Sequence, residues 1–155
     1  MINFDSAFIC NKDDLYKEIE NIRNGKTNSL LDNKIIWFLD EINQIDGVFT
    51  LYSCWGHEEH YPYIIINLND YWRDIFMNKI SLNIKNKYNQ CKISNSFINL
   101  FYIKNKLNKR ENVGHVFFIK NYDKNINDEK SYCFYSFILN LFEKEINKNE
   151  KIYCY

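Results

Sequence analysis

The chain has 155 residues, enough for one domain whose core needs no disulfide or metal to be stable. Its formal net charge is zero, which excludes the strongly basic composition of many nucleic-acid-binding proteins. Residues with A/T-rich codons dominate the composition, so we give most weight to the scarce glycine, proline, histidine and tryptophan residues.

The charges are distributed unevenly along the chain. Residues 75–110 carry eight basic side chains and no acidic one, whereas residues 1–74 carry thirteen acidic and six basic side chains. The basic segment can form a positive surface for a phosphate-bearing ligand or an acidic protein partner. It can equally neutralise the acidic N-terminal half across an interface within the fold.

Cysteine usage and hydropathy indicate the compartment. The five cysteines are widely spaced and form no CxxC pair, which is typical of reduced thiols rather than of a disulfide framework. The first 14 residues include acidic side chains and lack the long apolar core of a signal peptide. The sequence has no apolar run of about 18 residues, which is the length that would predict a membrane span. We therefore expect a soluble, cytoplasmic protein without a membrane partner.

Apolar periodicity predicts helices and then strands in the first half of the chain. Gly47 is placed to cap the end of the second helix, directly before the first strand. The second strand is a continuous apolar run and should be buried on both faces. The expected elements are a strand or arm at 2–10, helices at 13–24 and 29–45, and strands at 48–53 and 63–68.

The second half predicts a similar mixture of elements. Asn69 or Asp70 is expected to cap a short helix after the second strand. The following elements are a strand at 80–84, a strand or helix at 96–104, a central strand at 113–120, a helix at 128–147 and an edge strand at 151–155. We expect a single α+β domain over residues 1–155. Its mixed or antiparallel sheet of four to six strands would be covered by three or four helices.

The scarce residue types gather in the link between the strands at 48–53 and 63–68. Gly56 permits close approach of an anion to backbone amides, and the aromatic residues offer rings on which a base can stack. The candidate ligand-binding residues are Ser53, Cys54, Trp55, Gly56, His57, Tyr61 and Tyr63.

The same segment allows three other interpretations. Cys54, His57 and His60 have a spacing that zinc accepts, with a further ligand to come from elsewhere in the chain. In that case Glu58 or Glu59 could act as a general base on metal-bound water. A second interpretation makes Cys54 a nucleophile. In the third, Cys54 is a small buried hydrophobe and the segment has a purely structural role.

A short motif in this region resembles a known group of proteins. The pattern T-x-x-S-C-x-G-H, followed by P-Y-[IV], resembles a group of small uncharacterised bacterial and phage proteins; it is formed by Thr50, Ser53, Cys54, Gly56, His57, Pro62, Tyr63 and Ile64. The resemblance covers about a quarter of the chain and implies a helix before the motif, but no particular activity. A looser likeness connects Tyr52–His57 to the S-S-C-S-G-R segment of a methyltransferase family that acts in wybutosine synthesis on tRNA.

We therefore expect a small binding protein rather than an enzyme. Its anionic, nucleotide-like ligand would be received by the Ser53–Tyr63 loop and the basic 75–110 segment, without a cofactor. One alternative is a metal-dependent hydrolase that uses Cys54, His57 and His60, with zinc as the metal. The other is a phage-encoded inhibitor of a host defence or nucleic-acid enzyme.

Overall fold

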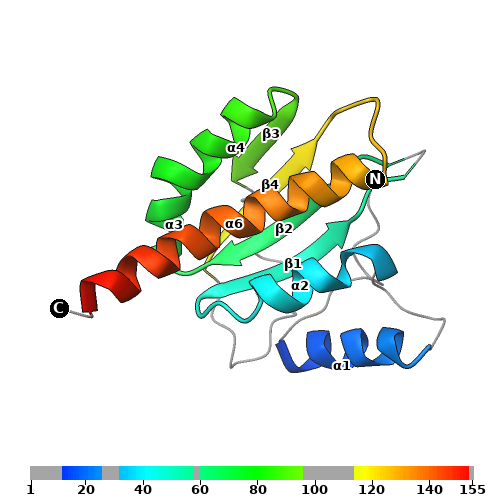
Figure 1. Ribbon diagram of the computed structural model, residues 1–155, viewed down its shortest axis with the longest axis horizontal. Coiled ribbons are helices and arrows are strands. Elements are labelled where there is room, and N and C mark those ends of the chain that lie inside the picture. The colour runs from blue at the N-terminus through cyan, green and yellow to red at the C-terminus, as the bar shows by residue number, and fades with distance from the viewer. Residues whose placement is uncertain (1–11, 26–31, 58–59, 96–113, 154–155) are drawn as a thin grey trace.

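The computed structural model describes residues 12–25, 32–57, 60–95 and 114–153. Within these ranges four strands form one antiparallel sheet in the order β1-β2-β4-β3 (Figure 1). The strands are β1 (Val48–Cys54), β2 (Tyr63–Leu68), β3 (Cys91–Asn95) and β4 (His115–Asn121). The predicted α+β fold with an antiparallel sheet is confirmed.

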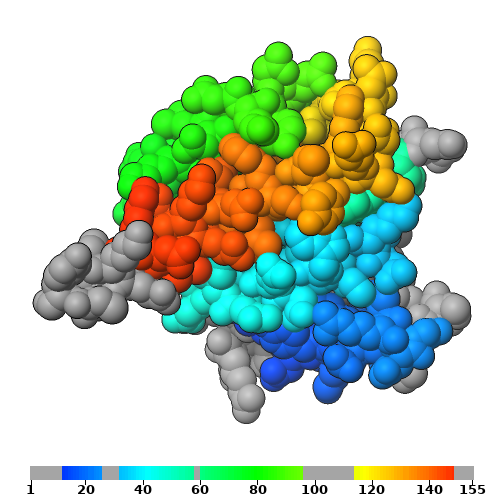
Figure 2. Space-filling model, viewed as in Figure 1, coloured from blue at the N-terminus to red at the C-terminus, as the bar shows by residue number. Residues whose placement is uncertain are grey.

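The helices lie mainly against one face of this sheet (Figures 1 and 2). They are α1 (Lys12–Arg23), the 3₁₀ turn η1 (Asn33–Ile35), α2 (Ile36–Ile42), α3 (Asp70–Ile75), the π-helical turn η2 (Phe76–Ile80), α4 (Ser81–Lys87) and α6 (Asp128–Tyr153). The long helix α6 crosses the sheet with α2 on one side and the α3–η2–α4 helix on the other. Helix α1 packs against α2 at the margin of this layer.

Strand β2 is buried on both faces, as predicted. Phe117 of β4 contacts Phe76 of η2, with ring centroids 4.7 Å apart, so Phe117 faces the helices. Its cross-strand partner Ile66 must lie on the same face. Because strand side chains alternate, Tyr63 and Phe118 lie on the opposite face.

Helices α3 and α4 are joined into one helix by the π turn η2. The buried apolar side chains of this joined helix recur every four residues: Trp72, Phe76, Ile80 and Ile84. In a regular α-helix that spacing would rotate each successive side chain by about 40° away from the sheet, because each residue turns the helix by about 100°. In η2 the Ser81 amide donates to the Phe76 carbonyl, five residues earlier, and this wider turn offsets much of the rotation.

The predicted strand at 80–84 is therefore wrong, because residues 80–84 are helical. Ile80, Leu82 and Ile84 alternate in the sequence as the apolar residues of a strand would. In the helix, however, Ile80 and Ile84 are buried and Leu82 is exposed. The predicted edge strand at 151–155 is also wrong for residues 151–153, which continue α6. Residues 154–155, like the elements predicted at 2–10 and 96–104, lie outside the described residues.

The second predicted helix is shorter than expected, since its α-helical part ends at Ile42. Asn43 explains the stop. Its buried side chain donates to Thr50 Oγ1 at 2.8 Å and accepts from the Thr50 amide at 2.9 Å, which ties the helix end to β1. The other predicted elements are found near their expected positions. In particular, Asn69 caps α3 by accepting a hydrogen bond from the Trp72 amide.

Across the part of the chain that the structure describes, no helix combines the length and apolar character needed to cross a bilayer.

Candidate functional site

The connection between β1 and β2 is a hairpin that begins with a required glycine. Gly56 has a φ of +96°, and a Cβ atom at this position would lie 2.8 Å from Pro62 Cδ. Beyond it, the backbones of His57 and His60 exchange two hydrogen bonds of 2.9 Å. The scarce glycine and proline thus contact one another and determine the path of the chain into the hairpin.

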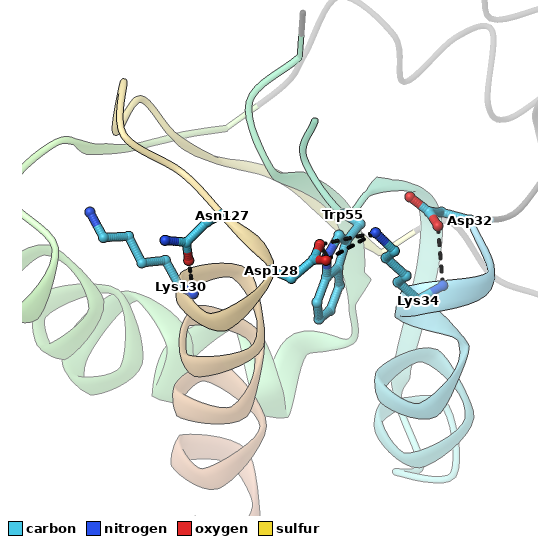
Figure 3. Close-up of polar contacts among 6 residues, drawn as sticks. All are labelled: Asp32, Lys34, Trp55, Asn127, Asp128 and Lys130. Atoms are coloured by element: carbon cyan, nitrogen blue, oxygen red, sulfur yellow. Dashed lines mark hydrogen bonds and ion pairs between the residues drawn. The ribbon is translucent and has the colours of Figure 1, made fainter. Parts of the chain in front are cut away.

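Trp55 does not present its ring to solvent, because it is only 4% exposed. Its Nε1 donates to Asp128 at 2.9 Å, at the start of α6, and Lys34 Nζ binds the same carboxylate at 3.1 Å (Figure 3). The indole stacks on Tyr135 with centroids 5.6 Å apart and an angle of 17°. Trp55 therefore joins β1 to α6 and η1, and little of it remains for stacking a ligand.

Tyr135 anchors the base of the hairpin from within the core. The side chain is fully buried, and its hydroxyl donates to the Tyr63 carbonyl at 3.1 Å and to the Cys54 carbonyl. These two acceptors belong to directly paired residues of β1 and β2. Burial raises the pKa of Tyr135 well above its usual value, so the hydroxyl remains a donor at neutral pH.

Cys54 and the two histidines do not form the predicted three-ligand metal site. Within residues 12–25, 32–57, 60–95 and 114–153, no group of three or more His, Cys, Asp and Glu side chains is arranged to hold a metal ion. Burial raises the pKa of the Cys54 thiol, which disfavours the thiolate needed by a nucleophile. The third histidine, His115, contacts Asp70, with its Nε2 2.7 Å from the carboxylate.

Of the three rings predicted to stack a base, Tyr63 is covered as Trp55 is. Tyr63 is 7% exposed and stacks between Tyr52 and Phe118, with centroids 5.4 and 5.5 Å apart. Ser53 pairs with Ile64, and this places its side chain toward the helices. The remaining predicted ring, that of Tyr61, lies beside a basic cluster on the face of the sheet opposite the helices.

This cluster, which we call the lysine–tyrosine surface, consists of Tyr61, Lys92, Lys120 and Tyr122. The Tyr61 and Tyr122 rings are in contact, with centroids 5.2 Å apart. Lys120 Nζ lies 5.7 Å from the centre of Tyr61 and 5.0 Å from that of Tyr122. Lys92 Nζ approaches Tyr122 from β3 at 5.3 Å.

Backbone pairing positions the members of the lysine–tyrosine surface. Lys120 pairs with Lys92 on one side and with Tyr63 on the other. The Asn121 amide donates to the Pro62 carbonyl at 3.0 Å, which brings Tyr61 alongside Tyr122 beyond the ends of the strands. Sequence reasoning missed Lys120 and Tyr122. Their i, i+2 spacing after Phe118 was the available signal, since it places all three on one face.

The basic 75–110 segment is divided between different parts of the fold. Lys79 pairs with Glu145 of α6 at 3.7 Å, and Lys87 lies over the ring of Phe137. Lys92 reaches the lysine–tyrosine surface from β3. Residues 96–110 lie outside the described ranges. The hairpin loop and the basic segment were predicted to form one binding surface. Tyr61 of the loop and Lys92 of the segment both belong to the lysine–tyrosine surface.

A surface hollow of about 590 Å³ is found elsewhere, along α1. Its described lining consists of Asp13, Tyr16, Lys17, Glu20 and Asn21. Two carboxylates and one lysine make this hollow unfavourable for an anion, so the lysine–tyrosine surface is the better candidate.

No family model, curated protein or solved structure matches this chain. The resemblance of the Thr50–Ile64 motif to small bacterial and phage proteins stays a prediction, and function has to be inferred from the chemistry of the site.

Proposed function

We propose that this protein binds a small anionic, nucleotide-like ligand at the lysine–tyrosine surface. The proposal rests on one observation, the direct cross-strand pairing of Lys92 with Lys120 beside two tyrosine rings.

Like charges directly opposite one another destabilise a sheet. Among the described residues, neither Lys92 nor Lys120 makes an ion pair with a carboxylate, and both ammonium groups gather around the same ring. Cation–π contacts at exposed positions contribute only about 0.5–1 kcal/mol each. A phosphate group between the two ammonium groups would relieve the repulsion and form charge-assisted hydrogen bonds with both.

The tyrosine rings supply the second half of the recognition. Tyr122 is 37% exposed and Tyr61 is half-buried, so a planar group can stack on their outer surfaces. Stacking of a base on an aromatic side chain contributes roughly 1–3 kcal/mol. A ligand that combines a planar ring with a phosphate fits this surface better than either group alone, which is why we propose a nucleotide-like compound.

The test is a titration of the full chain with nucleoside mono-, di- and triphosphates, and with the corresponding nucleosides. Calorimetry and the shift in melting temperature measure binding, because a ligand that binds only the folded state raises that temperature. We expect the phosphorylated compounds to bind and the nucleosides to bind more weakly. Affinity should fall as salt concentration rises, since exposed charges are screened.

Three variants locate the binding surface. Lys92→Gln and Lys120→Gln should each weaken binding by about tenfold, corresponding to roughly 1.4 kcal/mol for one charge-assisted hydrogen bond. Lys85→Gln is the matched control, because Lys85 is an exposed lysine of α4 outside the lysine–tyrosine surface. If no phosphorylated compound binds, or if Lys85→Gln weakens binding as much as the other two, the proposal is wrong.

A further inference from the structure

His57 and His60 form a pair at the tip of the β1–β2 hairpin. They are each other's backbone partners, through two hydrogen bonds of 2.9 Å. Directly paired residues of antiparallel strands project their side chains to the same side. Both histidines are exposed, and their ring centroids lie 4.7 Å apart with an interplanar angle of 79°.

We infer that His57 and His60 together chelate a transition-metal ion such as Ni²⁺ or Zn²⁺. The site is distinct from the three-ligand arrangement with Cys54 and independent of the proposed anion binding. Imidazole suits both metals, and water would occupy their remaining coordination positions.

The separation of the rings matches this geometry. A metal bound at about 2.0–2.1 Å from an imidazole nitrogen lies about 3.2 Å from the ring centre. Two rings whose centres are 4.7 Å apart then subtend about 95° at a shared metal. This angle lies between the roughly 90° of neighbouring octahedral or square-planar positions and the roughly 109° of a tetrahedral site.

Chelation requires one nitrogen of each ring to turn toward a common point without the rings moving apart. Rotation about χ2 turns the ring about an axis that passes close to its centre, so the 4.7 Å separation is almost preserved. This torsion is broad for histidine, and neither exposed ring is enclosed by the core. The backbone pair therefore supplies the spacing, and side-chain rotation supplies the orientation.

Calorimetric titration of the untagged, reduced chain with Ni²⁺ tests the inference. We expect one ion per chain at this site. His57→Gln and His60→Gln should each weaken its binding by about 100-fold or more, because the second imidazole binds intramolecularly. His115→Gln is the matched control, since it removes the third histidine, which contacts Asp70, and should bind Ni²⁺ like the wild type.

Proton NMR spectra of the three imidazoles give a second readout that separates this site from the cysteines. Substoichiometric paramagnetic Ni²⁺ should broaden the His57 and His60 signals before that of His115. The inference is overturned if the His57→Gln and His60→Gln variants retain wild-type affinity, or if all three signals broaden together.

Discussion

The Tyr135 hydroxyl offers a sharp test of how the hairpin is held to the core. The Tyr135→Phe variant removes this oxygen and leaves the ring against Trp55 and Phe38. The carbonyls of Cys54 and Tyr63 then lose the donor that they share. No cavity larger than the lost oxygen is created, so the change in stability should reflect hydrogen bonding rather than packing.

The expected loss follows from the number of protons. One hydroxyl carries one proton, so the variant loses the equivalent of one neutral hydrogen bond, although two carbonyls are affected. Such a bond contributes about 0.5–1.5 kcal/mol, and a buried acceptor left unpaired costs about 1–3 kcal/mol. We expect the free energy of unfolding to fall by about 1.5 kcal/mol, or a melting temperature about 3–6 °C lower for a chain of this size.

Urea unfolding followed by circular dichroism measures this difference, provided that the m-value is the same in both proteins. Tyr132→Phe is the matched control on the same helix, because Tyr132 is 55% exposed and should change stability by less than about 0.5 kcal/mol. Equal stability of Tyr135→Phe and the wild type would refute the role given to this hydroxyl. If Tyr132→Phe lost as much free energy of unfolding, the effect would come from any tyrosine-to-phenylalanine change in this helix and not from the Tyr135 hydroxyl.

Three further outcomes are expected. Because burial raises the pKa of Tyr135, this tyrosine loses its proton in the unfolded state first, near pH 10. The free energy of unfolding, measured with urea, should therefore fall as the pH rises above about 10, and it should fall less steeply in Tyr135→Phe. Gly47→Ala should destabilise more than Gly25→Ala, as thermal unfolding can show. Both have positive φ, which costs alanine about 1 kcal/mol, but only the Cβ at 47 meets another side chain, at 2.0 Å. Burial raises the pKa of Cys91 to about 12, so mass spectrometry after iodoacetamide treatment at pH 8 should find it modified more slowly than the exposed Cys133.

Local patterns predicted the elements that depend on near neighbours in sequence. The continuous apolar run of β2 and the Asn69 cap each act within a few residues, so one sequence is enough to locate them. Gly47 has a positive φ directly before β1, but the prediction that it caps the second helix is wrong, because α2 ends at Ile42 and its C-cap is Asn43. The alternation of Ile80, Leu82 and Ile84 misled the prediction of a strand at 80–84. The π turn lets Phe76, Ile80 and Ile84 share the buried side of one helix, and nothing local in the sequence indicates such a turn.

The candidate site depends on contacts that no local pattern contains. The buried Trp55 packs on Tyr135 and donates its Nε1 hydrogen to Asp128, which is 73 positions away in the sequence. Lys92 meets Lys120 through the register of β3 with β4. The scarcity of glycine, proline and histidine located the hairpin correctly, but it could not show which aromatic rings remain accessible.

The π turn of the α3–η2–α4 helix has a consequence for how the chain can change in length. If one residue were deleted between Phe76 and Ile80, the buried positions would be spaced by four, three and four residues, which is the stripe of an ordinary α-helix. The apolar side chains would then still meet the sheet without the wider turn. This helix can therefore tolerate the evolutionary loss of one residue while β2 and β4 keep the same packing partners.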